Sequence, residues 1–419
     1  MIFWAYNILL IFLAPFWVPW MLWRAKKRDE KPNWRQRTGD LPFEPPAKGV
    51  RRAWVHAVSV GEVMAALPVL REIRQLDPDL EIVLSTTTSS GQTAAKEKAE
   101  GLYDQLIYFP IDVPRFVVAA MIRVRPKVVA VMETELWLNF LHFAKLFGAE
   151  TILINGRISD RSYPRSMRIK PYYQTMFENL DRVLAQTEVD AQRFKDLGFS
   201  EPLVAGNTKF DGAVEAPVTD TDWRQELQIP DGELVTVIGS TRSEAEERFI
   251  YEAFAEAKPE GTVIHAPRHI ERSDEIVERM SELYPGEVVK RSTGCAGKYI
   301  VLDTYGELGD VYSIADIAIV GGGFDDLGGQ NILQPLGKGV PVIHGKHMQN
   351  FSVAASAADN AHAAVSVSEP SELCFWLIRL QANEQERAEM SENAKSLVQN
   401  SLGASKRCAE AVVEAAKTE

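Results

Sequence analysis

The sequence predicts an α/β protein of two domains, each built on a parallel sheet, behind an apolar amino-terminal segment. Beyond residue 50, the 419-residue chain alternates short β-branched runs with longer amphipathic stretches, a pattern typical of parallel sheets covered by helices. A turn-rich stretch divides these runs into two series. The first 23 residues carry no charged side chain.

The apolar segment is long enough to cross a bilayer once, because about 20 apolar residues at 1.5 Å per residue span a ~30 Å hydrocarbon core. Four tryptophans in the segment suit a lipid interface, and two prolines complicate a straight helix. We therefore predict a membrane anchor over residues 1–25. Whether the anchor crosses the bilayer or lies in one leaflet stays open. A cleaved signal peptide is disfavoured, because its positive charges would precede the apolar run.

The stretch that follows the anchor is basic. Seven arginines and lysines stand against two acids between residues 24 and 37, a local charge of +5 in a chain of net charge −12. Basic residues beside a hydrophobic segment stay in the cytoplasm. The domains are thus expected on the cytoplasmic side of the membrane, with these residues against anionic lipid headgroups. The acidic remainder argues against nucleic-acid binding, which needs a basic face.

The first series predicts an amino-terminal domain over residues 30–212. A β-branched run at residues 53–58 predicts a strand, and an amphipathic helix is expected directly after it, over residues 61–76. Further strands are expected over residues 81–87, 128–132, 151–155 and 182–186.

A linker is expected over residues 213–222, where turn formers dominate. The second series predicts a carboxyl-terminal domain over residues 223–419, with strands over residues 235–239, 262–266, 298–303, 317–321 and 340–345. Two such domains facing each other would form a cleft, and ligands of open α/β sheets bind beyond the carboxyl ends of the strands.

A candidate catalytic carboxylate, Glu62, follows the first strand. Ser59 and Glu62 have the spacing of a capping box, in which Glu62 only hydrogen-bonds back to the start of the helix. The local sequence favours this structural interpretation. A carboxylate at a strand end can also take the proton of an acceptor hydroxyl, and spacing does not decide between the two roles.

Two further acids, Glu133 and Glu135, follow the strand at residues 128–132 and precede an apolar helix. A helix N-terminus favours negative charge, which would explain them structurally. Two carboxylates separated by one residue could equally bind the hydroxyls of a sugar acceptor, so both interpretations stay open.

In the second series, residues 239–241 end a strand before a helix whose exposed amides could bind phosphate. Arg268 and His269 follow the next strand, where a guanidinium can contact a carboxylate or phosphate through two hydrogen bonds; a surface Arg–His pair is the alternative. A loop with five glycines over residues 321–329 precedes a helix expected over residues 332–336. Glycines permit close backbone approach to a ligand, although their spacing here is not the dinucleotide-binding pattern.

These motifs together resemble the 3-deoxy-D-manno-octulosonic acid (Kdo) transferases, over nearly the whole chain. The resemblance is carried, in chain order, by WRQRTG (34–39), HAVSVGE (56–62), YFPID (108–112), RPK (125–127), ETELW (133–137), NGRISDRS (155–162), GNTKFD (206–211), PRH (267–269), DTYGEL (303–308) and HMQNF (347–351).

The resemblance implies a GT-B glycosyltransferase fold whose amino-terminal domain binds the acceptor and whose carboxyl-terminal domain binds the donor, CMP-Kdo. It implies transfer of Kdo to a lipid A precursor (lipid IVA), with inversion at the anomeric carbon, in lipopolysaccharide biosynthesis. The resemblance also implies that no metal or other cofactor is needed, and in agreement no Asp-x-Asp pair stands near the donor motifs. Helix N-termini and Arg268 would then offset the charge of the departing CMP.

Carried onto this chain residue by residue, the resemblance makes Glu62 the general base, and Glu133 and Glu135 stand as candidate acceptor-binding residues. The implied donor-binding residues are Gly239, Ser240, Thr241, Arg268, His269, Gly306, Glu307, Leu308, Asn331 and Gln334.

The chain departs from the family pattern at a few positions. It has Gln330 and Gln334 where the family usually has His and Glu, and Arg242 where the family often has His. An uncharged acceptor loses part of the roughly 1.5–3 kcal/mol that a hydrogen bond to a charged group contributes. Two alternatives therefore stay open: a related transferase that uses another nucleotide sugar, and a catalytically silent relative that binds the lipid A precursor.

Overall fold

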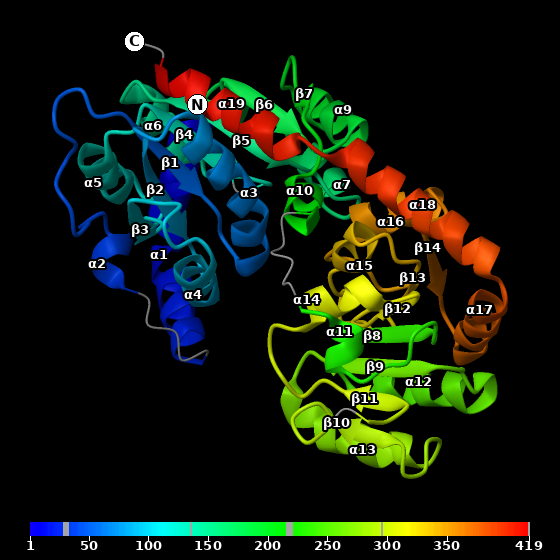
Figure 1. Cartoon of the computed structure of the whole chain (residues 1–419). Coiled ribbons are helices and arrows are strands. Elements are labelled where there is room, and N and C mark those ends of the chain that lie inside the picture. Colours follow the sequence, from blue (N-terminus) through cyan, green and yellow to red (C-terminus); the bar gives the residue numbers. More distant parts are fainter. Residues whose placement is uncertain (28–32, 135, 215–220, 295, 418–419) are drawn as a thin grey trace. The chain divides into compact units, whose positions relative to one another are not determined.

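In the computed structural model, which describes residues 1–27, 33–134, 136–214, 221–294 and 296–417, the chain divides into two units (Figure 1). The amino unit comprises Met1–Gly212 and Ser401–Glu419, and the carboxyl unit comprises Ala213–Asn400. Each unit contains a seven-stranded parallel sheet among its described residues. The predicted α/β class is confirmed.

The sheet of the amino unit has the strand order β3-β2-β1-β4-β5-β6-β7. Five of these strands are those predicted from sequence, and β3 and β7 are additional. The strands are β1 (Arg52–His56), β2 (Glu81–Thr86), β3 (Gln105–Tyr108), β4 (Val128–Met132), β5 (Glu150–Gly156), β6 (Arg182–Ala185) and β7 (Leu203–Val204).

Helices cover both faces of this sheet, so successive residues of a strand enter different cores. In β1, Val55 lies in a core shared with Leu70, whereas Trp54 lies in a second core with Phe140. The helices before the carboxyl unit are α1 (Ile2–Lys27), α2 (Trp34–Arg37), α3 (Val60–Leu76), α4 (Ser89–Lys98), α5 (Pro114–Val124), α6 (Leu138–Leu146), α7 (Tyr163–Arg168), α8 (Lys170–Phe177), α9 (Glu188–Leu197) and α10 (Thr208–Val214).

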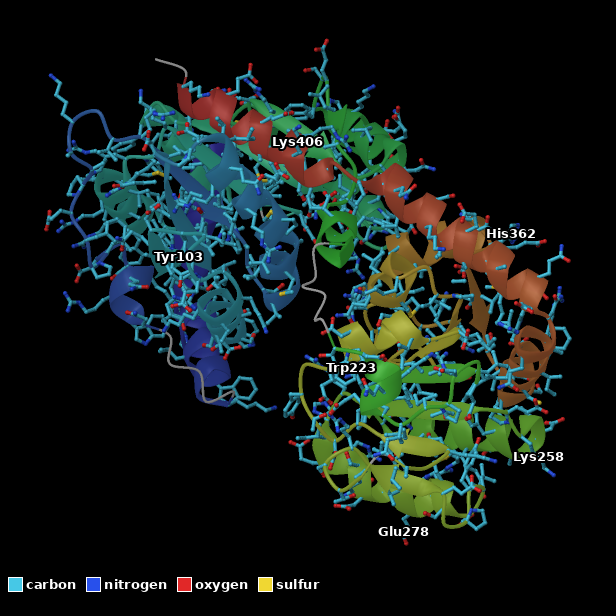
Figure 2. All side chains as sticks on the ribbon, viewed as in Figure 1. Tyr103, Trp223, Lys258, Glu278, His362 and Lys406 are labelled. Atoms are coloured by element: carbon cyan, nitrogen blue, oxygen red, sulfur yellow. The ribbon has the colours of Figure 1, made fainter. Side chains whose placement is uncertain are left out.

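The last helix, α19 (Ala404–Lys417), belongs to the amino unit and packs on α3 (Figure 1). This corrects the prediction that residues 223–419 form one domain. The reason is an apolar stripe that includes Cys408 and Val412, which are buried in the core that also contains Leu70. Asp211 holds the start of the helix, because its carboxylate accepts hydrogen bonds from the backbone of Gly403 and Ser405, both at 2.7 Å. Lys406, labelled in Figure 2, lies on the exposed side of α19.

The sheet of the carboxyl unit has the order β10-β11-β9-β8-β12-β13-β14. The sequence predicts five of these strands and misses β10 and β14. The strands are β8 (Val235–Thr241), β9 (Thr262–Pro267), β10 (Val288–Lys290), β11 (Tyr299–Val301), β12 (Ile317–Val320), β13 (Val342–Gly345) and β14 (Ala364–Val367).

The carboxyl unit begins its ordered secondary structure at Trp223, which is labelled in Figure 2 and is only 6% exposed. Of the predicted linker, residues 215–220 lie outside the described residues. The helices and 3-10 turns are α11 (Trp223–Glu226), α12 (Glu244–Ala257), η1 (Ile270–Arg272), α13 (Ser273–Ser281), α14 (Leu308–Val311), η2 (Tyr312–Ile314), α15 (Leu333–Gly337), α16 (Ser352–Asn360), α17 (Pro370–Ala382) and α18 (Glu384–Ser401).

Within the described residues, Ile2–Trp20 is the stretch of helix long and apolar enough to cross a membrane. It forms most of α1; only 6% of it is fully buried, and its other residues are partly buried or exposed. Two prolines, Pro15 and Pro19, lie inside the helix without ending it.

Candidate functional site

Glu62 lies in the first turn of α3, directly after β1. One of its carboxylate oxygens accepts a hydrogen bond from the Val58 N–H at 2.8 Å, and the hydroxyl of Ser59 donates to the other at 3.4 Å. Ser59 is the N-cap residue, but its side chain accepts no hydrogen bond from the helix backbone. The carboxylate thus binds the N–H of the residue before the N-cap, and neither hydrogen bond of the predicted capping box is among these contacts. Glu62 is held in place, and its half-buried side chain keeps access to solvent.

The histidine of the same motif, His56, is buried beside Glu62's loop and serves the core. Its ring stacks on Phe109 with 3.8 Å between the ring centres, and its Nδ1 lies 2.9 Å from the hydroxyl of Ser85. Burial lowers the pKa of His56 to about 3, so the imidazole is neutral at physiological pH. Of the two ionisable groups in this motif, Glu62 is the one suited to proton transfer.

Glu133 follows β4 and lies in an ion-pair cluster. Its carboxylate is 2.8 Å from the ammonium of Lys209 and 3.9 Å from the guanidinium of Arg157. Arg157 follows β5 and Lys209 lies on α10, so three loops at one edge of the sheet converge here. Two cations against one carboxylate leave the cluster with a net positive charge. Glu135, the second predicted acceptor residue, lies outside the described residues.

Backbone strain marks the same edge. Glu133 and Asn155, at the ends of the adjacent strands β4 and β5, both have a φ of +52°. Left-handed backbone at a residue other than glycine costs on the order of 1–3 kcal/mol and is concentrated at functional sites. The side-chain oxygen of Asn155 accepts a hydrogen bond from the Thr208 N–H at 3.1 Å, which joins the loop after β5 to α10.

In the carboxyl unit, residues 239–241 form an irregular end to β8. Gly239 must be a glycine, because a Cβ there would lie 1.9 Å from the hydroxyl of the buried Tyr312. Ser240 has a φ of +61° and sits at a shift in the register with β9. Thr241 is fully buried, and its hydroxyl is hydrogen-bonded to Nε2 of His265 at 2.8 Å, which fixes the end of β8 against β9.

Arg268 and His269 leave β9 beside this loop, since the Arg268 N–H donates to the Thr241 carbonyl at 2.8 Å. Both side chains are exposed. The loop after β11 approaches from the other side of the site: a methyl group of Leu308 lies 3.3 Å from the position that a Cβ of Gly239 would occupy. Glu307 in this loop pairs with Arg291 at 3.6 Å.

The glycine-rich loop after β12 packs against Ser240. A Cβ on Gly321 would lie 2.7 Å from the Ser240 carbonyl oxygen, and the Gly321 N–H donates to the Gly239 carbonyl at 2.8 Å. The side chain of Asn331 accepts a hydrogen bond from the Leu333 N–H at 3.0 Å at the start of α15.

Glu246, in the first turn of α12, fastens the glycine-rich loop to the end of β8. Its fully buried carboxylate accepts hydrogen bonds from the N–H groups of Arg242 at 2.9 Å and Phe324 at 3.2 Å. Burial raises the pKa of Glu246, and these N–H donors oppose the rise. The N–H of Glu246 in turn donates to the side chain of the N-cap residue Ser243 at 3.3 Å, which is one half of a capping box, while its carboxylate binds the N–H of Arg242, the residue before the cap.

The structure thus places the predicted donor residues at the ends of the neighbouring strands β8 and β9 and in the segments that follow β11 and β12, where Leu308 begins α14 and Gln334 lies on α15. Their contact with a donor stays a prediction. Sequence reasoning singled out neither Arg157 nor Lys209, although both lie in the motifs that carry the resemblance. Their signal was a charged residue inside a glycine- or asparagine-containing loop after a strand.

Comparison with known proteins identifies the family. The family model described as 3-deoxy-D-manno-octulosonic-acid transferase (kdotransferase) matches residues 32–212. The 3-deoxy-D-manno-octulosonic acid transferase of Bordetella pertussis is 31% identical over 430 residues, 97% of this chain and 98% of that protein. The protein of the same name from Haemophilus influenzae is 32% identical over 73% of each chain.

Solved structures show the same fold at low sequence identity. A glycosyltransferase from Rickettsia africae aligns with a TM-score of 0.59 and 13% identity, over 88% of this chain and 100% of its own. MurG from Acinetobacter baumannii aligns with a TM-score of 0.58 and 14% identity, over 87% of this chain and 99% of its own. Both support two α/β units in one chain.

Proposed function

The chain belongs to the Kdo transferase family of GT-B glycosyltransferases, and from this membership we propose that it transfers Kdo from CMP-Kdo to a lipid A precursor in lipopolysaccharide biosynthesis. The observation that carries the proposal is the gathering of the donor motifs at one edge of the carboxyl unit's sheet. There, Ser240, Arg268 and the glycine-rich loop provide backbone amides and a guanidinium, the groups that bind phosphate.

In the proposed reaction, Glu62 takes the proton of an acceptor sugar hydroxyl. The hydroxyl oxygen attacks C2 of Kdo, and the bond from C2 to the phosphate oxygen of CMP breaks with inversion at C2. The pair of electrons in that bond leaves with CMP, and Arg268 with neighbouring amides offsets the added charge without a metal ion. The hydrogen bond from Val58 to Glu62 supports this role, because it orients a carboxylate at a strand end.

We infer that the acceptor contacts the amino unit around Glu133, at the carboxyl edge of that unit's sheet. Its carboxylate is engaged by Lys209 and Arg157. An acceptor hydroxyl that contacts Glu133 would therefore meet a carboxylate already oriented by two cations. The positive charge of the cluster also suits an acidic acceptor better than a neutral one.

We place the enzyme on the cytoplasmic side of the inner membrane, with α1 as its anchor. Support comes from the apolar, largely exposed surface of α1 and from the basic stretch that follows it in the sequence.

The test is direct. Membranes containing the chain are given CMP-Kdo and a tetraacylated lipid A precursor, and products are identified by mass. Addition of Kdo supports the proposal, and membranes carrying the Glu62→Gln chain are the matched control. Absence of any Kdo-bearing product would favour a catalytically silent lipid-binding relative.

One observation favours a second candidate, a transferase for another nucleotide sugar. Gln334 stands where the family usually has Glu, and its side-chain nitrogen lies 3.6 Å from the position that a Cβ of Gly309, on α14, would occupy. A neutral amide at this position favours a donor whose binding does not need a carboxylate from the protein. Competition between CMP and UDP for the donor site separates the two: preferential displacement of donor by UDP would select the second candidate.

A further inference from the structure

The apolar helix α1 is fixed to the amino unit by polar side chains in its first two turns. The side-chain amides of Asn7 and Asn139 exchange two hydrogen bonds, each of 2.9 Å. The hydroxyl of Tyr6 donates to Asp112 at 2.9 Å. We call Tyr6, Asn7, Asp112 and Asn139 the α1 lock.

The partners on the amino unit are themselves rigidly held. Asp112 accepts hydrogen bonds from the backbone of Asn139 at 3.2 Å and Phe140 at 2.8 Å, at the start of α6. The amide of Asn139 also donates to the Asp112 carbonyl at 2.7 Å. Asn7, Asp112 and Asn139 are 8%, 6% and 0% exposed, so the lock is closed to solvent.

Aromatic contacts extend the seam on either side of the lock. Phe3 lies over His142 of α6, with 4.2 Å between ring centres, and Tyr6 lies 5.8 Å from Tyr172 of α8. The partly or fully buried residues recur at helical spacing and so form one face of α1: Ile2, Phe3, Tyr6, Asn7, Leu10, Ala14, Trp17 and Val18.

The opposite face of α1 is apolar and open. Trp4 is 69% exposed, and Phe12 and Phe16 are each 74% exposed. Trp20 and Trp23 lie further along the same face, towards the end of the helix. A soluble protein rarely leaves such a continuous apolar face uncovered. Tryptophans at the end of an apolar face, followed in sequence by a basic stretch, match a membrane surface with anionic headgroups.

The same unit holds the beginning of α1 and the next described helix, α2. The α1 lock fixes the beginning of α1, and α2 begins at Trp34. There, Gln36 accepts a hydrogen bond from the Tyr108 N–H at 2.8 Å, and the Arg37 carbonyl accepts one from the Ile111 N–H at 2.9 Å. A 26-residue helix is about 39 Å long, so one that crossed the bilayer would carry its first turns to the far side.

If α1 crossed the bilayer, the α1 lock could not be closed. The lock joins Asn7 to α6, which also carries Lys145 in an ion pair with Asp181 on the surface of a domain expected in the cytoplasm. We propose that α1 does not span the bilayer but lies in its cytoplasmic leaflet, with one face bonded to the amino unit and the other in lipid. This rests on the membrane attachment proposed above and settles its topology.

The first experiment determines where the amino terminus lies. A short hydrophilic peptide with one cysteine is placed before Met1, and a membrane-impermeant thiol reagent is applied to spheroplasts and to inverted inner-membrane vesicles. The expected result is labelling in inverted vesicles only, as for the control Lys48→Cys on the exposed surface of the amino unit. Labelling in spheroplasts would overturn the proposal.

The second experiment asks whether the α1 lock persists in the membrane. Phe3→Cys and His142→Cys, which leave the four residues of the α1 lock unchanged, are combined and treated, in inner-membrane vesicles, with a short bifunctional thiol reagent. Cross-linking is expected for this pair and not for Trp4→Cys with His142→Cys, because Trp4 is 69% exposed on the opposite face of α1. Equal cross-linking of both pairs, or of neither, would count against the lock.

Neither readout needs enzyme activity, so both remain valid if Kdo transfer is disproved. Release of the unmodified chain from membranes by high salt would instead disprove the anchoring itself. The peptide-tagged chain keeps the lock intact, so the first experiment stands even where the paired cysteine variant does not fold.

Discussion

Replacing Glu62 by Gln separates its two candidate roles, because Gln keeps the shape of the side chain and an acceptor oxygen. In the structure, the carboxylate accepts the Val58 N–H at 2.8 Å. Hydrogen bonds to charged groups contribute roughly 1.5–3 kcal/mol and neutral ones about 0.5–1.5 kcal/mol. Since the side chain is half-buried and solvent screens part of its charge, the stability lost is about 1 kcal/mol at most.

A loss of that size leaves the chain folded, because domains are stable by about 5–15 kcal/mol. Loss of a general base, in contrast, slows a reaction by roughly 10²- to 10⁴-fold, which is about 2.7–5.4 kcal/mol in the activation barrier. The two roles therefore predict effects of different size in different measurements. The purified variant should unfold in urea almost as the parent chain does and bind CMP normally, yet transfer Kdo 10²- to 10⁴-fold more slowly.

Ser59→Ala is the matched control. It removes the weak 3.4 Å contact to Glu62 and leaves the carboxylate in place, so the rate of transfer should stay within about threefold of the parent chain, a change of under 1 kcal/mol in the barrier. Near-normal turnover by Glu62→Gln, or a fall in rate matched by an equal fall in folded protein, would refute catalysis and leave Glu62 with its capping role.

Three further predictions concern other parts of the molecule. Burial raises the pKa of Asp112 from 3.8 to about 6. The stability linked to its neutral form is therefore complete below about pH 4 and is lost as pH rises through 6. Compared with the Asp112→Asn chain, the parent chain should lose about 3 kcal/mol of stability to urea between pH 4 and pH 7, and equal pH dependence of the two chains would contradict this. Gly239→Ala should cost at least about 1–3 kcal/mol of stability and abolish CMP binding, since its Cβ would overlap Tyr312, whereas Gly294→Ala, which meets nothing within 4 Å, should change neither. Gln334→Glu should lower the KM for CMP-Kdo by about tenfold, equivalent to ~1.4 kcal/mol from a charged acceptor, and an unchanged KM would show that this residue does not contact the donor.

The central strands could be predicted from sequence because both of their faces are buried. The limits predicted for β4 agree with the structure at both ends, since its five residues form an unbroken apolar run and are all buried. The missed strands lie at or near sheet edges: β7 has two residues, both exposed, and the residues of β10 are only half-buried. With little burial, such strands carry too weak a pattern to distinguish them from loops.

The sequence also could not show which core a helix enters. The apolar stripe of α19 is visible in the sequence, but the same stripe would fit the carboxyl unit. The contacts that hold α19 to the amino unit come from residues far away in the chain, such as Asp211 at its start and Ala205, whose carbonyl accepts a hydrogen bond from Arg407. The ion pair of Glu133 with Lys209 joins residues 76 positions apart, and the bond of Asn7 to Asn139 joins residues 132 positions apart. Spacing carries no information at such separations until the strand order is known.

The distribution of left-handed backbone gives an independent reason to place ligands at the strand ends. Arg125 and Lys258 have positive φ at helix C-caps, where this conformation closes the helix and needs no other explanation. Glu133, Asn155 and Ser240 have it at the ends of β4, β5 and β8, where no helix is being closed. A non-glycine residue in this conformation persists only where surrounding contacts impose it, and these three lie at the carboxyl edges where open α/β sheets bind ligands. Because this reasoning uses backbone geometry and no motif, it supports the two sites separately from the family resemblance.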